Sequence, residues 1–411
     1  MNYEKHRNFK YNEKYFDLGN LKKFLYAYFP DYNKFDFVHV AGSKGKGTTC
    51  KIVADYLSDF SKTGLFISPH VLKINERISV NGENISDKDF ARIKKEVEKF
   101  SDNFFVENGV KRLTFFEELF VVALKYFYEK KCKYVVLEVG LGGRLDATNI
   151  VLPKVCGLTL VEKEHADILG KTVKKILNEK LGIKKIGVPF VIGRQQKNIE
   201  KFLTEKFEKD KDVFFAEEIF CKDAVCKNGI VGTCFNPNFS LAYGLLKRLM
   251  GSVDCGKFFE ICRDFKMVGR FDVRKKSGKE IVFDIAHTPK SMENLVRNLK
   301  EKYPSGKFSF VVSVMKDKEI LPILRQILRV ANSVVFTNAN KVRGEKSEKL
   351  KKVFDELLRA DGQNKSKRIL VKKSENPIVA FKFALKNMKK EDVVVVTGSS
   401  FLVSEILTYR L

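Results

Sequence analysis

The chain has 411 residues, of which 44% are hydrophobic and 31% charged, and this length suffices to bury the cores of two or three domains without disulfides or structural metals. No apolar run approaches the roughly 20 residues of a membrane span, the charged and aromatic start lacks the core of a signal peptide, and the eight cysteines form no CxxC pair, so we expect a cytoplasmic protein with reduced thiols and no membrane partner. The net charge of +26 comes from basic residues spread along the whole chain, with few arginines, so we interpret it mainly as compositional bias that says little about partners; a polyanionic small substrate fits the excess as well as nucleic acid would.

Short β-like runs alternate with longer amphipathic runs along most of the chain. Residues 36–41 (DFVHVA) predict a buried strand that ends in a glycine-rich turn, and residues 48–60 predict a helix with Ile52, Tyr56 and Phe60 on one face. Further strands are predicted at 64–68, 133–139 and 155–161, and further helices at 172–182, 195–209 and 238–250. This alternation is typical of a parallel sheet with helices on its faces.

A second series of strands and helices begins after about residue 266. Its strands are predicted at 281–284, 307–314, 333–337, 368–371 and 392–397, with a helix at 291–303 after the first of them. We therefore expect an α/β protein with two domains: residues 1–265 around a mainly parallel sheet, and a smaller Rossmann-like domain over residues 266–411. In open sheets of this kind, ligands bind beyond the carboxyl ends of the strands.

A glycine-rich loop, Gly42-Ser43-Lys44-Gly45-Lys46-Gly47-Thr48, follows the first predicted strand and opens a helix. Its glycines let backbone N–H groups point at a phosphate, the helix N-terminus adds partial positive charge, and Lys46 can reach the β- and γ-phosphates. The strict Walker pattern fails at Val40, where its first glycine would stand, and at Gly47, where Ser or Thr would follow the lysine. The strand–loop–helix context still predicts that a nucleotide binds at Gly42, Gly45, Lys46, Gly47 and Thr48.

The loop HVAGSKGKGTT resembles the nucleotide loop of the folylpolyglutamate synthase and dihydrofolate synthase family, which belongs to the Mur ligase superfamily. The run LEVGLGGRLDATN at 137–149 is similar to the most specific signature of this family over its whole length. The remaining similar segments are SPHVL at 68–72, NERI at 75–78, NG at 81–82, TFFE at 114–117, EKLGI at 179–183, GRF at 269–271, DIAHTP at 284–289 and TGS at 397–399. The resemblance extends, in order, over about residues 15 to 405.

This resemblance implies an ATP-dependent ligase that joins L-glutamate to a pterin carboxylate. The carboxylate would accept the γ-phosphoryl group of ATP, and the α-amine of glutamate would attack the acyl phosphate. Residues 1–265 would be the ATP-binding domain of Mur ligase type, and residues 266–411 a ligase domain that closes over the nucleotide and excludes water. Dihydropteroate, a reduced folate, or both remain possible acceptors, and we favour a bifunctional enzyme that acts as a monomer.

The resemblance also implies a magnesium site. Ser68, Glu138 and His165 would be the ligands of the first ion. Ser68 and Glu138 lie at the ends of predicted strands and His165 follows the end of another, where a side chain can meet a cation beside bound phosphate. Lys180 would be carbamylated, and its new negative charge would help to hold a second Mg²⁺. Lys46, His165 and Lys180 are thus the expected catalytic residues.

Further contacts with the substrates are implied for five residues. Arg270, Asp284 and His287 would contact ATP from the second domain, although hinge caps and ion pairs are an equal alternative for each one alone. Asn238 would lie on the adenine side, or would simply be a helix N-cap. Asp146, together with the stretch before residue 36, lies where the resemblance expects the pterin.

The sequence departs from the family pattern at five positions, each beside a key residue. They are Ser43 and Lys44 in place of Thr-Asn, Glu164 in place of Asp, Ile285 in place of Gly, and Thr288 in place of Asn. These departures bear on fine geometry and not on the class of reaction.

Three other functions fit parts of the sequence. A Mur ligase for a different carboxylate, such as a nucleotide-sugar, would have a further domain before the loop, for which the 41 preceding residues leave no room. A basic P-loop protein that binds nucleic acid would lose affinity by roughly 10³-fold or more between 50 and 200 mM salt. An inactive homologue is disfavoured by the presence of Lys46, Ser68, Glu138, His165 and Lys180.

Overall fold

The computed structural model describes residues 18–108, 112–221, 237–276, 278–360, 369–387 and 392–409. The chain divides into two units, Met1–Phe265 and Lys266–Leu411, and each unit has its own sheet. Within the described ranges, no helix has the length and hydropathy that a membrane span requires. Two of the eight cysteines, Cys226 and Cys234, lie outside these ranges.

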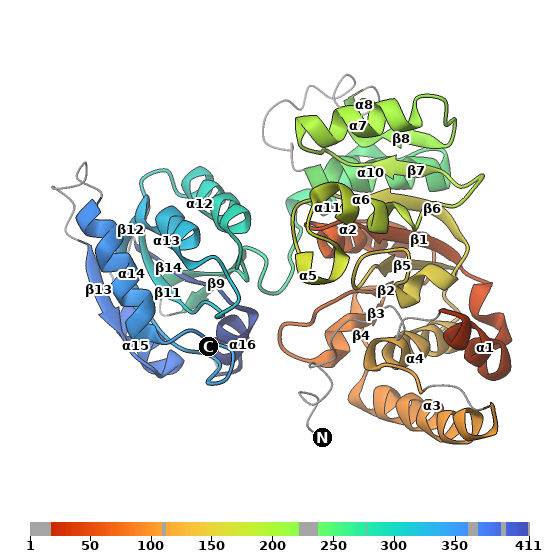
Figure 1. The fold of residues 1–411 in the computed structure, drawn as a ribbon, viewed down its shortest axis with the longest axis horizontal. Helices are drawn as coiled ribbons and strands as arrows, with labels where there is room; N and C mark the ends of the chain where they lie inside the picture. Colours follow the sequence, from red (N-terminus) through yellow and green to blue (C-terminus); the bar gives the residue numbers. More distant parts are fainter. Residues whose placement is uncertain are drawn as a thin grey trace. The chain divides into compact units, whose positions relative to one another are not determined.

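The sheet of the first unit has eight strands in the order β4-β3-β2-β5-β1-β6-β7-β8 (Figure 1). The pairs β2–β3 and β3–β4 are antiparallel, and the other five pairs are parallel, which confirms the expected mainly parallel sheet. The strands are β1 (Asp36–Ala41), β2 (Thr63–Phe66), β3 (Ile78–Val80), β4 (Glu83–Asn84), β5 (Tyr134–Glu138), β6 (Pro153–Leu158), β7 (Phe190–Ile192) and β8 (Val213–Phe215).

Two groups of helices in the first unit pack together, and α6 and α7 contribute to a further core with β6 and β7. In one group α2 packs against α10 and α11, and α10 also contacts α8 and β6. In the other, α1, α3 and α4 enclose an aromatic core in which Phe24 contacts Phe100, Phe104 and Phe105. The helices are α1 (Leu18–Tyr28), α2 (Lys46–Ser58), α3 (Asp87–Asn108), α4 (Phe115–Glu129), α5 (Ala166–Leu169), α6 (Val173–Leu181), α7 (Lys197–Phe207), α8 (Ala216–Phe220), α10 (Pro237–Met250) and α11 (Cys255–Arg263), with 3-10 turns η3 (Pro30–Asn33), η4 (Ile74–Arg77) and η5 (Ala147–Ile150).

The helix after the glycine-rich loop differs from its prediction at both ends. It covers Lys46–Ser58 and ends at the C-cap Asp59, so Phe60 lies beyond it. The expectation that Phe60 shares a helical face with Ile52 and Tyr56 was therefore wrong; its side chain is 50% exposed, and its ring lies 4.7 Å from the Lys257 ammonium. The prediction failed because the helical spacing of apolar residues continues to Phe60, whereas the helix itself ends at Ser58.

The second unit has a six-stranded sheet in the order β13-β12-β11-β14-β10-β9, which confirms the expected second α/β sheet. Five strands were predicted, and the sixth, β9, was missed because its sequence DVRKK is largely charged and only partly buried. It pairs antiparallel with β10, while all other pairs are parallel. The strands are β9 (Asp272–Lys276), β10 (Lys279–Phe283), β11 (Lys307–Val312), β12 (Ala331–Phe336), β13 (Leu370–Lys373) and β14 (Asp392–Thr397).

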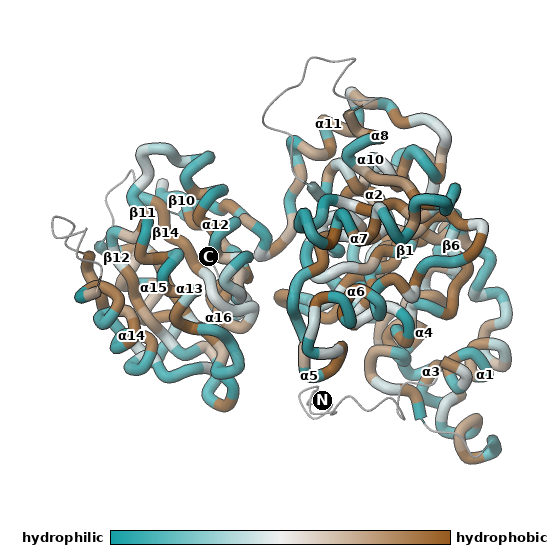
Figure 2. The backbone as a smooth tube through the Cα atoms, turned by 45° about the horizontal axis from the view of Figure 1, so that its top comes forward, coloured by the Kyte–Doolittle hydropathy of each residue, from teal (hydrophilic) through white to brown (hydrophobic). Residues whose placement is uncertain are grey.

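The core of the second unit forms where α12, α13 and α14 pack on the sheet through residues such as Met292, Ile323 and Leu350. Hydrophobic residues are concentrated along the central strands in Figure 2, as expected for parallel strands that are covered on both faces. The helices are α12 (Pro289–Lys302), α13 (Ile320–Leu328), α14 (Ser347–Ala360), α15 (Pro377–Lys386) and α16 (Ser400–Thr408). Residue 368, where one strand was expected to begin, lies outside the described residues.

Candidate active site

The glycine-rich loop joins β1 to the N-terminus of α2, as predicted. Gly42 and Gly45 have φ angles of 145° and 91°, and both are packed so closely that a side chain has no room. A Cβ at Gly42 would lie 1.7 Å from Thr159 Oγ1, and one at Gly45 would lie 1.9 Å from Asn238 Oδ1. Gly45 is the N-cap and carries no side-chain acceptor, so the first N–H groups of α2 can be offered to an anion.

Two lysine side chains meet at one backbone carbonyl in this loop. Lys46 Nζ donates to Gly42 O at 3.0 Å, and Lys180 Nζ, from α6, donates to the same oxygen at 2.9 Å. Lys180 Nζ also donates to Glu164 Oε1 at 3.2 Å, and Lys44 Nζ lies 3.5 Å from Glu164 Oε2. The loop therefore gathers three ammonium groups around a single carboxylate.

Burial and these neighbours shift the pKa values of the cluster. Lys180 is only 2% exposed, and burial, followed by repulsion from Lys46, lowers the pKa of its ammonium to about 8 against the opposing effect of Glu164. Burial acts to raise the pKa of Glu164, but Lys46, Lys180 and Lys44 outweigh it, and the net pKa is lowered. The result is an ionised carboxylate among cations.

Two of the departures from the family pattern contact each other. Lys44 and Glu164 form the ion pair described above, so the additional positive charge in the loop is balanced by a longer acidic side chain. Ser43 fixes the same two segments, because its Oγ donates to Glu162 O and accepts from Glu162 N, both at 3.1 Å. The sequence analysis treated Glu164 only as a neighbour of His165 and missed this ion pair. The signal was that two departures from the family pattern have complementary charges: Lys44 adds a positive charge, and Glu164 is longer than the usual Asp.

The three residues predicted to bind magnesium are partly brought together. Glu138 is the last residue of β5 and 4% exposed, and its Oε2 accepts from Ser68 N at 2.7 Å. Ser68 follows β2, which ends at Phe66 and not at Ser68 as expected. His165 is exposed, adopts φ 47° as the N-cap of α5, and lies beside Glu164.

The donor types at this point suit a hard cation. Ser68 and Glu138 offer oxygen, and Mg²⁺ in nucleotide sites uses one or two carboxylates and completes its shell with waters and phosphate oxygens. In the part of the chain that the structure describes, no three His, Cys, Asp or Glu side chains are grouped closely enough to hold a metal by themselves. The arrangement thus fits a magnesium ion that arrives with a nucleotide.

The segment that matches the family signature forms a loop against α6. A Cβ at Gly143 would lie 2.8 Å from Glu179 O, and Arg144 NH2 lies 3.0 Å from Glu179 Oε1. Asp146 is 6% exposed and turns the loop, because its carboxylate accepts from Leu141 N and from the backbone and hydroxyl of Thr148. The loop that carries the expected pterin residue thus lies against α6, the helix that carries Lys180.

Asn238 packs against the glycine-rich loop from the start of α10. It is the second residue of that helix, so the interpretation of Asn238 as an N-cap is wrong. Its contact with Gly45 is consistent with a position beside a bound nucleotide.

The other three expected ATP contacts lie in the second unit. Arg270 is exposed, and Asp284 follows β10 and accepts from Phe271 N and Ala286 N, both at 2.8 Å. Burial raises the pKa of Asp284, opposed by Arg270. His287 Nδ1 lies 2.8 Å from Ile285 O, directly before α12.

The structure also accounts for the two departures in this segment. Ile285 is 3% exposed and packs in the interior, and Thr288 caps α12 by accepting from Ser291 N at 3.3 Å. Both residues serve the local fold.

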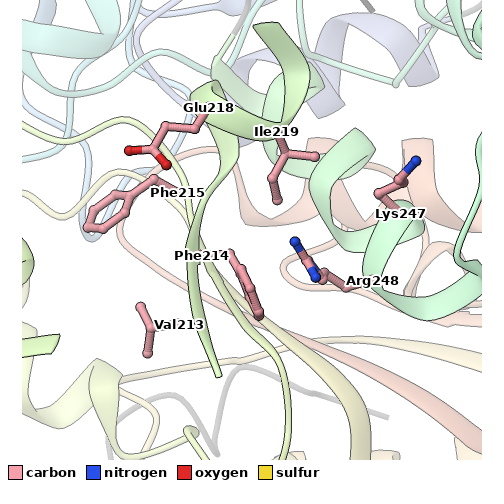
Figure 3. A pocket seen from close by; sticks show the side chains of 7 residues that line it. All are labelled: Val213, Phe214, Phe215, Glu218, Ile219, Lys247 and Arg248. Carbon is pink, nitrogen blue, oxygen red and sulfur yellow. The ribbon is translucent and has the colours of Figure 1, made fainter. Parts of the chain in front are cut away.

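A pocket of about 250 Å³ opens beside the edge strand β8, away from this site (Figure 3). The Arg248 guanidinium lies 3.5 Å from the centre of the Phe214 ring and forms one wall. Arg248 stands ten residues after Asn238 on α10, a separation of about 15 Å along the helix axis. The pocket is therefore distinct from the glycine-rich loop, and none of the predicted site residues lines it.

Comparison with known proteins matches both units to one family. The Mur ligase middle domain matches residues 40–220, and the Mur ligase glutamate ligase domain matches residues 269–400. A dihydrofolate synthase/folylpolyglutamate synthase of Bacillus subtilis (strain 168) is 28% identical over 419 residues, which cover 95% of this chain and 94% of that protein.

Solved structures share the fold over nearly the whole chain. A folylpolyglutamate synthase from Thermotoga maritima aligns with a TM-score of 0.77 at 26% identity and covers 95% of this chain and 92% of its own. A bifunctional folylpolyglutamate synthase/dihydrofolate synthase with Mn, AMPPNP and L-glutamate bound aligns with a TM-score of 0.79 at 24% identity, covering 99% of this chain and 96% of its own.

The close contact between Gly45 and Asn238 gives a test of the loop. In Gly45→Ala the new methyl group would collide with Asn238, and residue 45 would have to keep a left-handed backbone conformation. We therefore expect the affinity for AMPPNP, measured by isothermal titration calorimetry, to fall by at least tenfold. Gly82→Ala is the matched control, because Gly82 has a similar φ of 81° but open space around its Cα. Equal nucleotide affinity in the two variants would contradict the assignment of this loop.

Proposed function

We propose that this chain, which belongs to the folylpolyglutamate synthase and dihydrofolate synthase family of Mur ligases, is an ATP-dependent ligase that adds L-glutamate to a pterin carboxylate. The observation that carries this proposal is the convergence of Lys46 and Lys180 on Gly42 O at the N-terminus of α2. Such a concentration of positive charge is suited to a triphosphate, and the similarity to the Bacillus subtilis relative extends over 94% of that protein.

The chemistry requires activation of a carboxylate that is otherwise a poor electrophile. The pterin carboxylate attacks the γ-phosphorus of ATP, the bond to the bridging oxygen breaks, and ADP leaves. The α-amine of glutamate then attacks the acyl phosphate carbon, loses a proton, and expels inorganic phosphate as the amide forms. Lys46 and the N–H groups of α2 stabilise the negative charge on the phosphoryl group during transfer.

Ser68, Glu138 and His165 would hold the magnesium ion. When bound, that ion supplies charge neutralisation for the phosphoryl oxygens. Glu138 is already oriented by the amide of Ser68, and that contact would fix the carboxylate beside the phosphate loop. Arg270, Asp284 and His287 contribute to ATP binding from residues 266–411, and residues 1–265 form the ATP-binding domain.

The enzyme acts on both dihydropteroate and a reduced folate. The bifunctional name of the Bacillus subtilis relative supports this breadth. We further propose a cytoplasmic monomer without a nucleic-acid partner, since the basic residues are spread along the chain and contribute to a site for anionic small molecules.

An ADP-release assay with glutamate and either dihydropteroate or tetrahydrofolate tests the function. We expect magnesium-dependent turnover with both pterins, and a loss of 10²-fold or more in Lys46→Ala and in His165→Ala, if charge stabilisation dominates the barrier. Lys51→Ala is the control for the first variant, because Lys51 lies on the same helix and pairs with Asp55 at 2.8 Å. Absence of turnover with either pterin, or wild-type rates in both site variants, would contradict the proposal.

Lys180 is the proposed site of carbamylation. Its neutral amine would attack CO₂ and release a proton, and the carbamate would lie beside Lys44 and Lys46, which can balance its charge. With ¹³C-labelled CO₂ we expect one carbamate resonance in the NMR spectrum that is lost in Lys180→Ala. The resonance should persist in Lys184→Ala, a control lysine that pairs with Asp210 at 2.8 Å. A signal that survives in Lys180→Ala would place the carbamate elsewhere, and no signal in the wild type would refute it.

A further inference from the structure

A buried chain of hydrogen bonds connects the central strand β1 to Asp146. His39 is fully buried, and its Nε2 lies 2.8 Å from Thr148 Oγ1. The Thr148 hydroxyl lies 2.6 Å from Asp146 Oδ1, and Thr148 N donates to the same oxygen at 3.0 Å. The second carboxylate oxygen of Asp146 accepts from Leu141 N at 2.9 Å. The chain runs from the middle of the sheet to the loop that matches the family signature.

Burial raises the pKa of Asp146, and hydrogen bonds from Thr148 and Leu141 oppose that effect. With Asp146 ionised, the donors and acceptors in this chain have one consistent direction. Both oxygens of Asp146 accept from backbone N–H groups, which matches an ionised carboxylate. The Thr148 hydroxyl then donates to Asp146, and its oxygen accepts from His39. His39 must therefore carry its proton on Nε2, with Nδ1 as a bare acceptor.

The environment of His39 agrees with this tautomer. Burial, and to a lesser extent repulsion from Lys185, lowers the pKa of His39 to about 3, so the ring stays neutral. Its Nδ1 has no hydrogen-bond partner among the described residues. A buried unpaired acceptor costs stability, whereas an apolar residue such as the neighbouring Val38 or Val40 would fill a strand position without that cost. Packing alone does not explain a histidine here.

We infer that His39 and Thr148 are positioning residues that orient the Asp146 carboxylate toward the N–H and amino groups of a pterin ring. This inference rests on the function proposed above and assigns a role to two residues outside the expected site. The neutral His39 ring is suited to that role. Through Thr148 it fixes the orientation of the Asp146 carboxylate without neutralising it, so the negative charge remains available to the pterin. An imidazolium at the same place would itself neutralise Asp146.

His39 also lies on β1, three residues before Gly42 of the loop that follows this strand, and pairs in register with Leu137 of β5. The strand that ends in the phosphate loop thereby also supports the carboxylate of the pterin loop. This common support fixes the relative position of the two loops within the first unit.

Steady-state kinetics of the full chain test the inference. In Thr148→Val the hydroxyl is lost with little change of shape, and we expect KM for dihydropteroate to rise about tenfold or more while KM for ATP stays within about twofold. Thr148→Ser keeps the hydroxyl and should restore the wild-type KM. Thr63→Val is the matched control, since Thr63 is likewise buried, at 2% exposure against 0% for Thr148, and donates to Ser61 O at 2.9 Å, outside this chain of bonds. An unchanged KM for dihydropteroate in Thr148→Val, or an equal rise in Thr63→Val, would overturn the inference.

A second readout does not depend on turnover. The chain has five histidines, so ¹⁵N-histidine labelling gives a simple NMR spectrum in which protonated and bare ring nitrogens have separate shifts. We expect a signal, absent in His39→Gln, with Nε2 protonated and Nδ1 bare, unchanged from pH 5 to 8. A His39 ring that titrates in this range, or that carries its proton on Nδ1, would refute the hydrogen-bond direction. If this signal is found but neither pterin is turned over by the wild type, the proposed function fails and the hydrogen-bond chain stands.

Discussion

One backbone oxygen, that of Gly42, accepts hydrogen bonds from two lysine ammonium groups, and the candidate site is organised around this contact. Like charges at such a distance repel, so the arrangement needs a nearby anion. While Lys180 is unmodified, Glu164 supplies one negative charge among Lys44, Lys46 and Lys180, which leaves an excess of two positive charges; the proposed carbamate on Lys180 would remove that excess and bring a metal ion into the balance instead. A phosphate chain is a ligand that removes this excess.

The fold supplies the rigidity that such a cluster requires. Gly42 directly follows β1, which has parallel partners on both sides, and Lys180 comes from α6, against which the loop around Gly143 also packs. Because Lys180 is buried, its ammonium cannot turn away to solvent when the ligand is absent. Repulsion within the cluster is therefore retained until an anion binds, and this retained repulsion favours binding.

Local signals in the sequence predicted local structure well. The strand–loop–helix around Gly42–Thr48 and the mainly parallel sheet follow from hydrophobic periodicity and the placement of glycines. The partners of these elements could not be predicted in the same way. The pairing of Lys44 with Glu164, and the packing of Asn238 on Gly45, join segments far apart in the chain, and only the fold determines which distant side chains meet. The strand β9 could not be predicted for the same reason. Its residues are mostly charged, and it is recognisable as a strand only by its antiparallel pairing with β10.

The roles of individual residues depend most on the resemblance to known enzymes. The hydrogen bond between Ser68 and Glu138 supports their role at a metal site, and the meeting of Lys46 with Lys180 supports their role at a phosphate site. Asp284, in the second unit, has its hydrogen bonds within that unit. A crystal structure with AMPPNP and Mn²⁺, with the metal located by anomalous scattering, tests the central claim most directly. The account predicts phosphate oxygens on the N–H groups of residues 42–48 and a metal peak at Ser68 and Glu138. A nucleotide bound elsewhere, such as the pocket beside β8, would contradict it.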